Sequence, residues 1–110
     1  MKIVEIEVKA DSKEKFAGMY VFKVPVGTTF VKAIERDRKI VLIGLFDEKA
    51  DVELLMNKPR TIGIALADRV VPEYMQYIDS VLIQSTHLWH VFQRVEPQKF
   101  NPLQLLRHQS

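Results

Sequence analysis

Two apolar-rich runs near the end of the chain decide the fold: Tyr77-Ile-Asp-Ser-Val-Leu-Ile-Gln84 and His87-Leu-Trp-His-Val-Phe-Gln-Arg94, separated by Ser85-Thr86. Two runs of about eight residues joined by a short polar break are typical of a β-hairpin. The second run holds the only tryptophan of the chain. We therefore expect Trp89, together with Val91 and Phe92, to lie on a core strand that closes the domain.

Outward from this hairpin, apolar and polar residues alternate with the period of a strand. In residues 2–9, Val4, Ile6 and Val8 share one face, and charged residues share the other. Further strands are predicted at 19–24, 30–35 and 60–66. Residues 40–46 form an uninterrupted apolar run, which is typical of a central strand covered on both faces. Residues 47–57 are compatible with a short edge strand or a single helical turn.

Turn signals separate these runs at short intervals. Pro25-Val-Gly27-Thr supplies a fixed φ and a glycine, and the charged residues 36–39 form a second turn. Six or seven short strands with such spacing predict an all-β, mainly antiparallel fold, either a small β-sandwich or a barrel. We expect a single β domain over residues 1–96. Residues 97–110 form a C-terminal tail, in which Asn101 and Pro102 predict the start of a short helix.

Composition narrows the classes of protein that fit. The chain has 110 residues, a formal net charge of +2 and no cysteine, so thiolate metal sites, disulfides and thiol nucleophiles are excluded. The small positive charge is not the composition of a polyanion-binding protein. The longest apolar run is far too short for a membrane span. Strand pattern begins directly after Met1-Lys2, so we expect no signal peptide and a cytoplasmic location.

The order of these elements resembles a family of short, uncharacterised proteins of tailed bacteriophages and prophages. The resemblance covers residues 19–94. Its motifs are Pro25-x-Gly27, a strand ending in Leu-Phe-Asp47, Arg-Thr-Ile-Gly-Ile64, Tyr-Ile-Asp-Ser-Val81 and, most specific, Leu-Trp-His-Val-Phe92. Where the family has a Gly-Thr-Gly-His-like loop, this chain has Ala65-Leu-Ala-Asp-Arg69. The resemblance implies a phage or prophage origin and a bacterial host, and it carries no activity.

The sequence shows no arrangement of residues that supports catalysis or metal binding. His87 and His90 are three positions apart, and on a strand this spacing directs them to opposite faces. Ser80 or Ser85 with a histidine and Asp79 lacks a nucleophile-elbow signature. The four glycines are scattered, so there is no phosphate-binding loop; Gly44 and Gly63 lie within strands, where glycine marks a bulge or close backbone packing. We expect no enzyme activity, no metal and no cofactor.

Four basic residues in and beside the turn at 36–39 are the candidates for nucleic-acid binding: Lys32, Arg36, Arg38 and Lys39. With the aromatic side chains of Tyr20, Phe22 and Phe30 nearby, they would resemble a strand-based single-strand binder. The alternative interpretation is a solvated hairpin turn, in which Glu35 and Asp37 dilute the positive field. That interpretation is favoured.

The tail supplies candidates for an interaction with another molecule. Its apolar residues are Phe100, Leu103, Leu105 and Leu106. They either cap one end of the sheet within the same chain or dock onto a second subunit or a host protein. The sequence thus predicts a non-enzymatic phage or prophage accessory protein that binds a host protein or a small ligand and forms homo-oligomers through sheet edges. A nucleic-acid-binding protein is the alternative.

Overall fold

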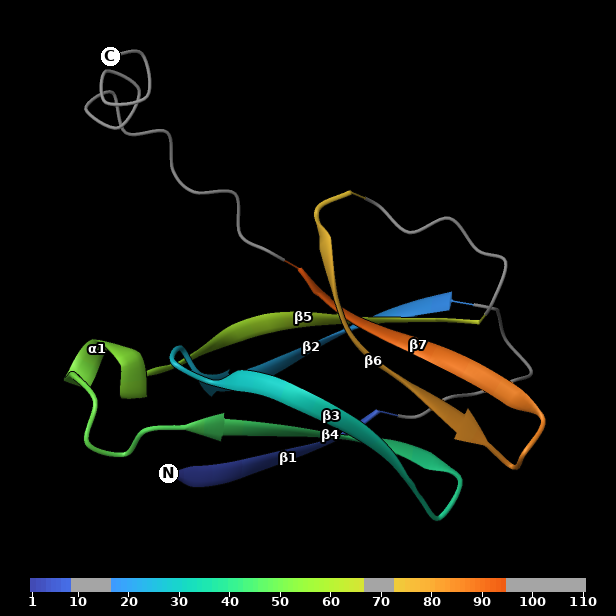
Figure 1. The fold of residues 1–110 in the computed structure, drawn as a ribbon. Helices are drawn as coiled ribbons and strands as arrows, with labels where there is room; N and C mark the ends of the chain where they lie inside the picture. The colour runs from blue at the N-terminus through green and yellow to red at the C-terminus, as the bar shows by residue number, and fades with distance from the viewer. Residues whose placement is uncertain (9–16, 67–72, 95–110) are drawn as a thin grey trace, which may run out of the picture.

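The computed structural model describes residues 1–8, 17–66 and 73–94, and over these ranges the chain forms seven strands and one helical turn (Figure 1). The elements, in chain order, are β1 (Lys2–Val8), β2 (Ala17–Pro25), β3 (Thr29–Arg36), β4 (Lys39–Phe46), α1 (Val52–Leu55), β5 (Asn57–Leu66), β6 (Met75–Ile83) and β7 (His87–Arg94). The all-β prediction is confirmed over these ranges. The expected C-terminal helix lies outside the described residues.

The strands pair in two antiparallel sheets. The smaller sheet has the order β1-β4-β3, and the larger has the order β2-β5-β7-β6. The two sheets are joined at the β3–β6 side, where Asp79 Oδ2 accepts a hydrogen bond from the Ala33 backbone N–H at 2.8 Å. Glu35 Oε2 accepts a second bond there, from the Gln84 N–H. These contacts connect two sheets that share no backbone ladder in the described residues.

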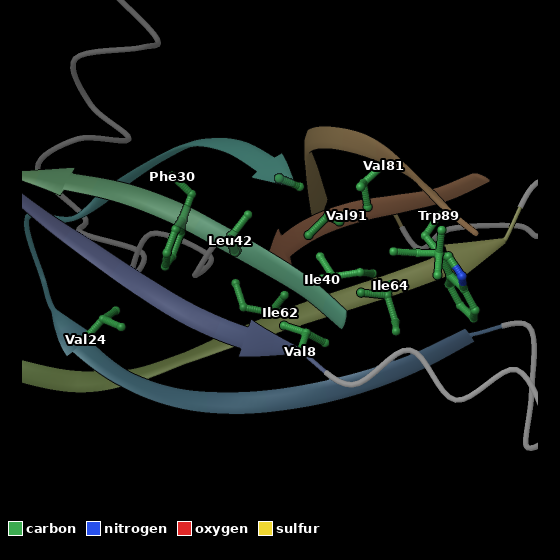
Figure 2. Packing of buried hydrophobic residues seen from close by; sticks show 12 residues of the cluster. Val8, Val24, Phe30, Ile40, Leu42, Ile62, Ile64, Val81, Trp89 and Val91 are labelled. Atoms are coloured by element: carbon green, nitrogen blue, oxygen red, sulfur yellow. The ribbon is translucent and has the colours of Figure 1, made fainter. Parts of the chain in front are cut away.

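A single cluster of apolar side chains fills the space between the sheets (Figure 2). Trp89 lies at one end of the cluster near Ile64, and Phe30 and Val24 lie at the other end. Trp89 is only 2% exposed, so the prediction that the tryptophan strand belongs to the core is confirmed. Because β7 lies between β5 and β6, its inward residues contact the core from the middle of the larger sheet.

The turn of the β6–β7 hairpin differs from the sequence prediction by one residue. Ile83 pairs with His87, so the loop has three residues, Gln84, Ser85 and Thr86, and not the two that the polar break indicated. Gln84 and Ser85 have φ of 55° and 58°, and the Thr86 N–H donates to the Ile83 carbonyl at 3.2 Å. Neither residue is a glycine, which is the usual signal for positive φ in a hairpin turn.

Strand β4 lies at the centre of its sheet, as the apolar run at 40–46 predicts. Ile40 and Leu42 point into the core and are fully buried. On the outer face, Val41 is also buried, although no further layer covers it in the described residues. Val41 pairs with Glu7 of β1 on one side and with Ile34 of β3 on the other, and Glu7 forms an ion pair of 2.8 Å with Lys39 of β4. Within residues 47–57, Val52–Leu55 form the single helical turn α1, and Asn57 begins β5.

One buried polar group gives a testable consequence of this packing. Thr28 is 5% exposed, and its hydroxyl has no hydrogen-bond partner among the described residues. A buried hydroxyl without a partner costs stability relative to a methyl group of the same shape. We expect Thr28→Val to leave the free energy of unfolding unchanged or to raise it by about 1 kcal/mol. A loss above about 1 kcal/mol in urea denaturation would show that the hydroxyl is bonded in solution.

Candidate anion-binding site

A cleft of about 590 Å³ opens at the end of the core beside the last residues of β7. Strand β5 continues past this point towards α1, while β7 pairs with it only from Ile62 onward (Figure 1). We call it the Arg60 cleft, after the arginine in its lining. Its polar lining consists of Lys58, Arg60, Thr61, Gln76, Gln93 and Arg94. No acidic side chain lines it among the described residues.

Strand alternation places Arg60 at the edge of the core. Arg60, Ile62 and Ile64 occupy alternate positions of β5, and the two isoleucines are buried. Arg60 therefore points inward, one position beyond the apolar cluster, and its guanidinium carbon lies 5.5 Å from the centre of the Phe30 ring. Such a cation–π contact adds to the burial of the aliphatic stem.

Neutral oxygen atoms hold the Arg60 guanidinium in place. Nη1 donates to the Thr28 carbonyl at 3.2 Å and to Gln93 Oε1 at 3.0 Å, and Nη2 donates to the Val26 carbonyl at 3.0 Å. The side chain thereby fixes the turn between β2 and β3 against β7. A guanidinium has five N–H protons. The Nε–H and one proton on the adjacent Nη2 have no bond within the described residues.

The charge of Arg60 has no carboxylate partner in the part of the chain that the structure describes. The ion pairs in the described residues involve Lys2, Arg36 and Lys39 but not Arg60. Partial burial lowers the pKa of Arg60 because it removes the guanidinium from water. The group stays charged at neutral pH, since arginine is not deprotonated in proteins. A half-buried cation held only by neutral acceptors leaves a positive potential at the cleft.

Two further cations add to this potential. Lys58 precedes Arg60 by two positions on β5, and Arg94 ends β7. The Arg94 guanidinium lies 5.5 Å from the centre of the Tyr74 ring, which limits the directions in which it can point. Gln93 Nε2 donates to Gln76 Oε1 at 3.0 Å, so the amide that accepts from Arg60 is itself held in orientation. The arrangement can bind an anion by charge and by several N–H donors together.

The structure separates the four basic residues that the sequence grouped for nucleic-acid binding. Arg36 pairs with Glu5 at 2.9 Å, and Lys39 pairs with Glu7, so β1 neutralises both. These contacts lower the pKa of Glu5 and raise the pKa of Arg36 and of Lys39, in each case first through the hydrogen bond and then through charge. Lys32 and Arg38 are exposed.

The aromatic residues expected beside this turn do not form a stacking surface. Phe30 is buried in the core, and Tyr20 and Phe22 pack against it. Bases could not stack on rings that face the space between the sheets. The part of the prediction that rested on exposed aromatics is therefore wrong, and nucleic-acid binding through Lys32, Arg36, Arg38 and Lys39 stays a prediction without that support. The interaction candidates Phe100, Leu103, Leu105 and Leu106 lie outside the described residues.

Ser80 and His90 form a contact that the sequence did not predict. Ser80 Oγ lies 2.6 Å from His90 Nδ1 and 2.7 Å from the Tyr77 hydroxyl. The two-residue loop expected for the hairpin would have set Ser80 opposite Val91, whereas the three-residue loop sets it opposite His90. Asp79 does not complete a triad, because its carboxylate accepts from the Ala33 and Ser80 backbone N–H groups. The cluster thus lacks the orienting carboxylate of a hydrolase.

The sequence contains one signal for the Arg60 cleft. Arg60 alternates with Ile62, Ile64 and Leu66, so it lies on the inward face of the predicted strand. Its guanidinium must then either extend to solvent or contact polar groups at the end of the core. The partners Gln93 and the Val26 and Thr28 carbonyls could not be found this way, because they depend on which strands are neighbours.

Comparison with protein-family models, with curated proteins and with solved structures finds no match to this chain. The interpretation of the Arg60 cleft as a binding site therefore rests on its geometry alone. Over the described residues, the structure contains no helix with the length and apolar character needed to cross a membrane.

Proposed function

We propose that the protein is a non-enzymatic binding module that takes a small anionic ligand, a carboxylate or a phosphate, in the Arg60 cleft. A phage or prophage origin and a role in the bacterial cytoplasm belong to the same proposal and rest on the sequence resemblance. One observation supports the ligand class above the others. Arg60 is a half-buried cation that opens on a cleft, and no carboxylate among the described residues neutralises it.

The donors left on Arg60 suit a planar or tetrahedral oxyanion. The Nε–H and a proton of the adjacent Nη2 can bind two oxygens of one group, which is the bidentate geometry that arginine favours for carboxylate and phosphate. Lys58 and Arg94 supply two more positive charges from the lining of the cleft. A ligand with at least two negative charges would use the site fully.

A purely structural role for Arg60 explains part of the geometry. Its bonds to the Val26 and Thr28 carbonyls tie down the β2–β3 turn. Lysine and proline on an exposed strand edge are also a common protection against aggregation, and Lys58-Pro59 fits that use. Neither role requires Arg94 on the opposite side of the cleft or the absence of acidic residues between the three cations. Ligand binding accounts for the whole set.

Titration calorimetry with pyrophosphate and with citrate, at low ionic strength, tests the proposal. We expect saturable binding of at least one of these probes to the wild-type protein. Arg60→Gln should weaken it at least tenfold, about 1.4 kcal/mol, and Lys58→Gln should weaken it several-fold. Arg38→Gln removes an exposed basic residue from the β3–β4 turn, away from the cleft, and should leave the affinity unchanged.

Two results would count against this function. One is the absence of saturable binding by either probe. The other is an equal loss in Arg38→Gln and Lys58→Gln, which would show attraction to net charge and not to a site. Thermal unfolding of each variant controls for damage to the fold, because Arg60→Gln also removes the bonds to the β2–β3 turn. Lys58 is exposed, so its variant keeps the test valid if Arg60→Gln unfolds.

A further inference from the structure

The outer face of the four-stranded sheet carries a contiguous apolar surface. Register alignment places one residue from each strand in a central row: Met19, Gly63, Phe92 and Tyr77. Leu82 and Leu88 extend this row on one side, and Val21 extends it on the other. Five of these side chains are between 43% and 64% exposed: Met19, Val21, Tyr77, Leu82 and Leu88. A patch of this kind on a monomer is uncommon and marks an interaction surface.

The outer face of the three-stranded sheet differs from this surface because it carries ion pairs between its strands. Ion pairs bridge its strands, with Glu5 to Arg36 and Glu7 to Lys39. Charged pairs of this sort are compatible with direct contact with water. On the four-stranded sheet, the outward positions of the described strands contain no carboxylate, and their charged residues are Lys23 and Arg94. The outer face of the four-stranded sheet therefore lacks the cross-strand ion pairs of the three-stranded sheet, although Ile3 and Val31 are exposed on the latter as well.

Three polar atoms within the apolar face bond one another. The Tyr77 hydroxyl, the Ser80 hydroxyl and His90 Nδ1 form one hydrogen-bonded chain. Buried polar groups cost little when they bond one another, and they cost much when they lose water without a replacement. The cluster can therefore be covered by an apolar partner without a large penalty.

We infer that this outer face is the contact surface for a second copy of the chain, in a symmetric face-to-face dimer. Two such sheets can pack as aligned layers about 10 Å apart, which is how sheets pack within domains. A two-fold axis brings the same residues from both copies together, so each apolar face meets its own equivalent. This inference is independent of the proposed function, and it uses a sheet face where the sequence had indicated sheet edges.

Charge favours a second copy over an acidic or basic partner. Lys23 and Arg94 both lie towards the Val21 end of the face, away from Leu82 and Leu88. If the strands of the two copies run in opposite directions, these cations lie at opposite ends of the interface and do not repel one another. The face has no other charge for a charged partner to recognise.

The size of the face suits a weak dimer. Four strands spaced at about 4.8 Å, each with about eight residues at 3.3 Å, give a flat area of roughly 500 Å². Stable interfaces bury about 800 Å² of accessible surface on each partner, and weak ones bury about 600 Å² or less. The flat area lies below both values, and side-chain relief makes the accessible area larger than the flat area. We expect a dimer that dissociates on dilution.

Sedimentation velocity over a wide range of protein concentrations tests the inference with two matched variants. Val21→Glu places a carboxylate on the apolar face, and Val31→Glu places the same group on β3 of the other sheet. The two valines are 64% and 50% exposed. We expect the wild-type protein and Val31→Glu to form dimers, and we expect Val21→Glu to raise the dissociation constant at least about tenfold.

Each other outcome overturns the inference. A wild-type chain that stays monomeric at the highest concentration shows that a different molecule, or none, covers the face. Equal effects of Val21→Glu and Val31→Glu, or no effect of Val21→Glu, show that the dimer uses another surface. Leu82→Glu at the far end of the face gives a second test should Val21→Glu fail to fold.

Discussion

Replacement of Trp89 by alanine should lower the free energy of unfolding by roughly 3–5 kcal/mol, because the indole fills one end of the core. Trp89 is 2% exposed and lies beside Ile64 in the apolar cluster (Figure 2). Loss of this side chain leaves a cavity that the surrounding strands can fill only in part by moving inward. For a chain of this length, we expect the melting temperature to fall by at least about 12 °C.

The adjacent residue provides the control for this experiment. Leu88 is on the opposite face of β7 and is 43% exposed. Leu88→Ala should cost less than about 1 kcal/mol in dilute solution, below the concentration at which we expect dimers to form. Urea denaturation followed by fluorescence cannot use the missing indole in Trp89→Ala, so circular dichroism should be used for both variants. Similar losses from the two substitutions would contradict the inward orientation of Trp89.

Two glycines should respond to alanine in opposite ways. A Cβ at Gly44 would lie 2.7 Å from the Thr28 Cγ2 and 2.9 Å from the Phe30 ring. Both neighbours are buried, so the added methyl has no room and should cost about 1–3 kcal/mol. A Cβ at Gly63 would also lie 2.7 Å from its nearest neighbour, but that atom is Cε of Met75, the end of a flexible side chain.

We therefore expect Gly63→Ala to be neutral or to stabilise the protein by up to about 1 kcal/mol, because alanine lowers the entropy of the unfolded chain. Equilibrium unfolding of both variants measures the difference directly. Thr28→Ser, which removes the methyl group that meets Gly44, should recover part of the loss when it is combined with Gly44→Ala. The description of the core near Phe30 would be wrong if Gly44→Ala were tolerated as well as Gly63→Ala.

Much of the fold was predictable from residue alternation. The runs that became β1, β3 and β5 were found from apolar periodicity, because a strand with one buried face repeats every two residues. The run that became β4 was found because it is apolar without interruption. The glycines at 44 and 63 were expected to mark a bulge or close backbone packing, but their nearest neighbours are side chains: Thr28 and Phe30 at Gly44, and Met75 at Gly63. The hairpin register was missed by one residue, since Gln84 and Ser85 adopt positive φ without the glycine or asparagine that normally signals it.

The candidate site was much less predictable. The sequence places Arg36, Arg38 and Lys39 in one turn and Lys32 shortly before it, so positive charge was predicted there. Pairing of β1 with β4 brings Glu5 to Arg36 and Glu7 to Lys39. These contacts between strands cannot be predicted before the strand order is known. Arg60, Lys58 and Arg94 come together only because β7 ends beside the middle of β5. Strand order, and not local sequence, determines which charges are left unpaired.

The most direct test of the account is the NMR signal of the arginine Nε–H groups during a titration with pyrophosphate. We predict that the Arg60 signal shifts saturably, because its Nε–H has no hydrogen bond in the described residues and is therefore free to donate to the anion. Arg36, which Glu5 already holds, should shift little. A titration that leaves Arg60 unchanged, or moves all arginine signals alike without saturation, would contradict the assignment of the Arg60 cleft as an anion site.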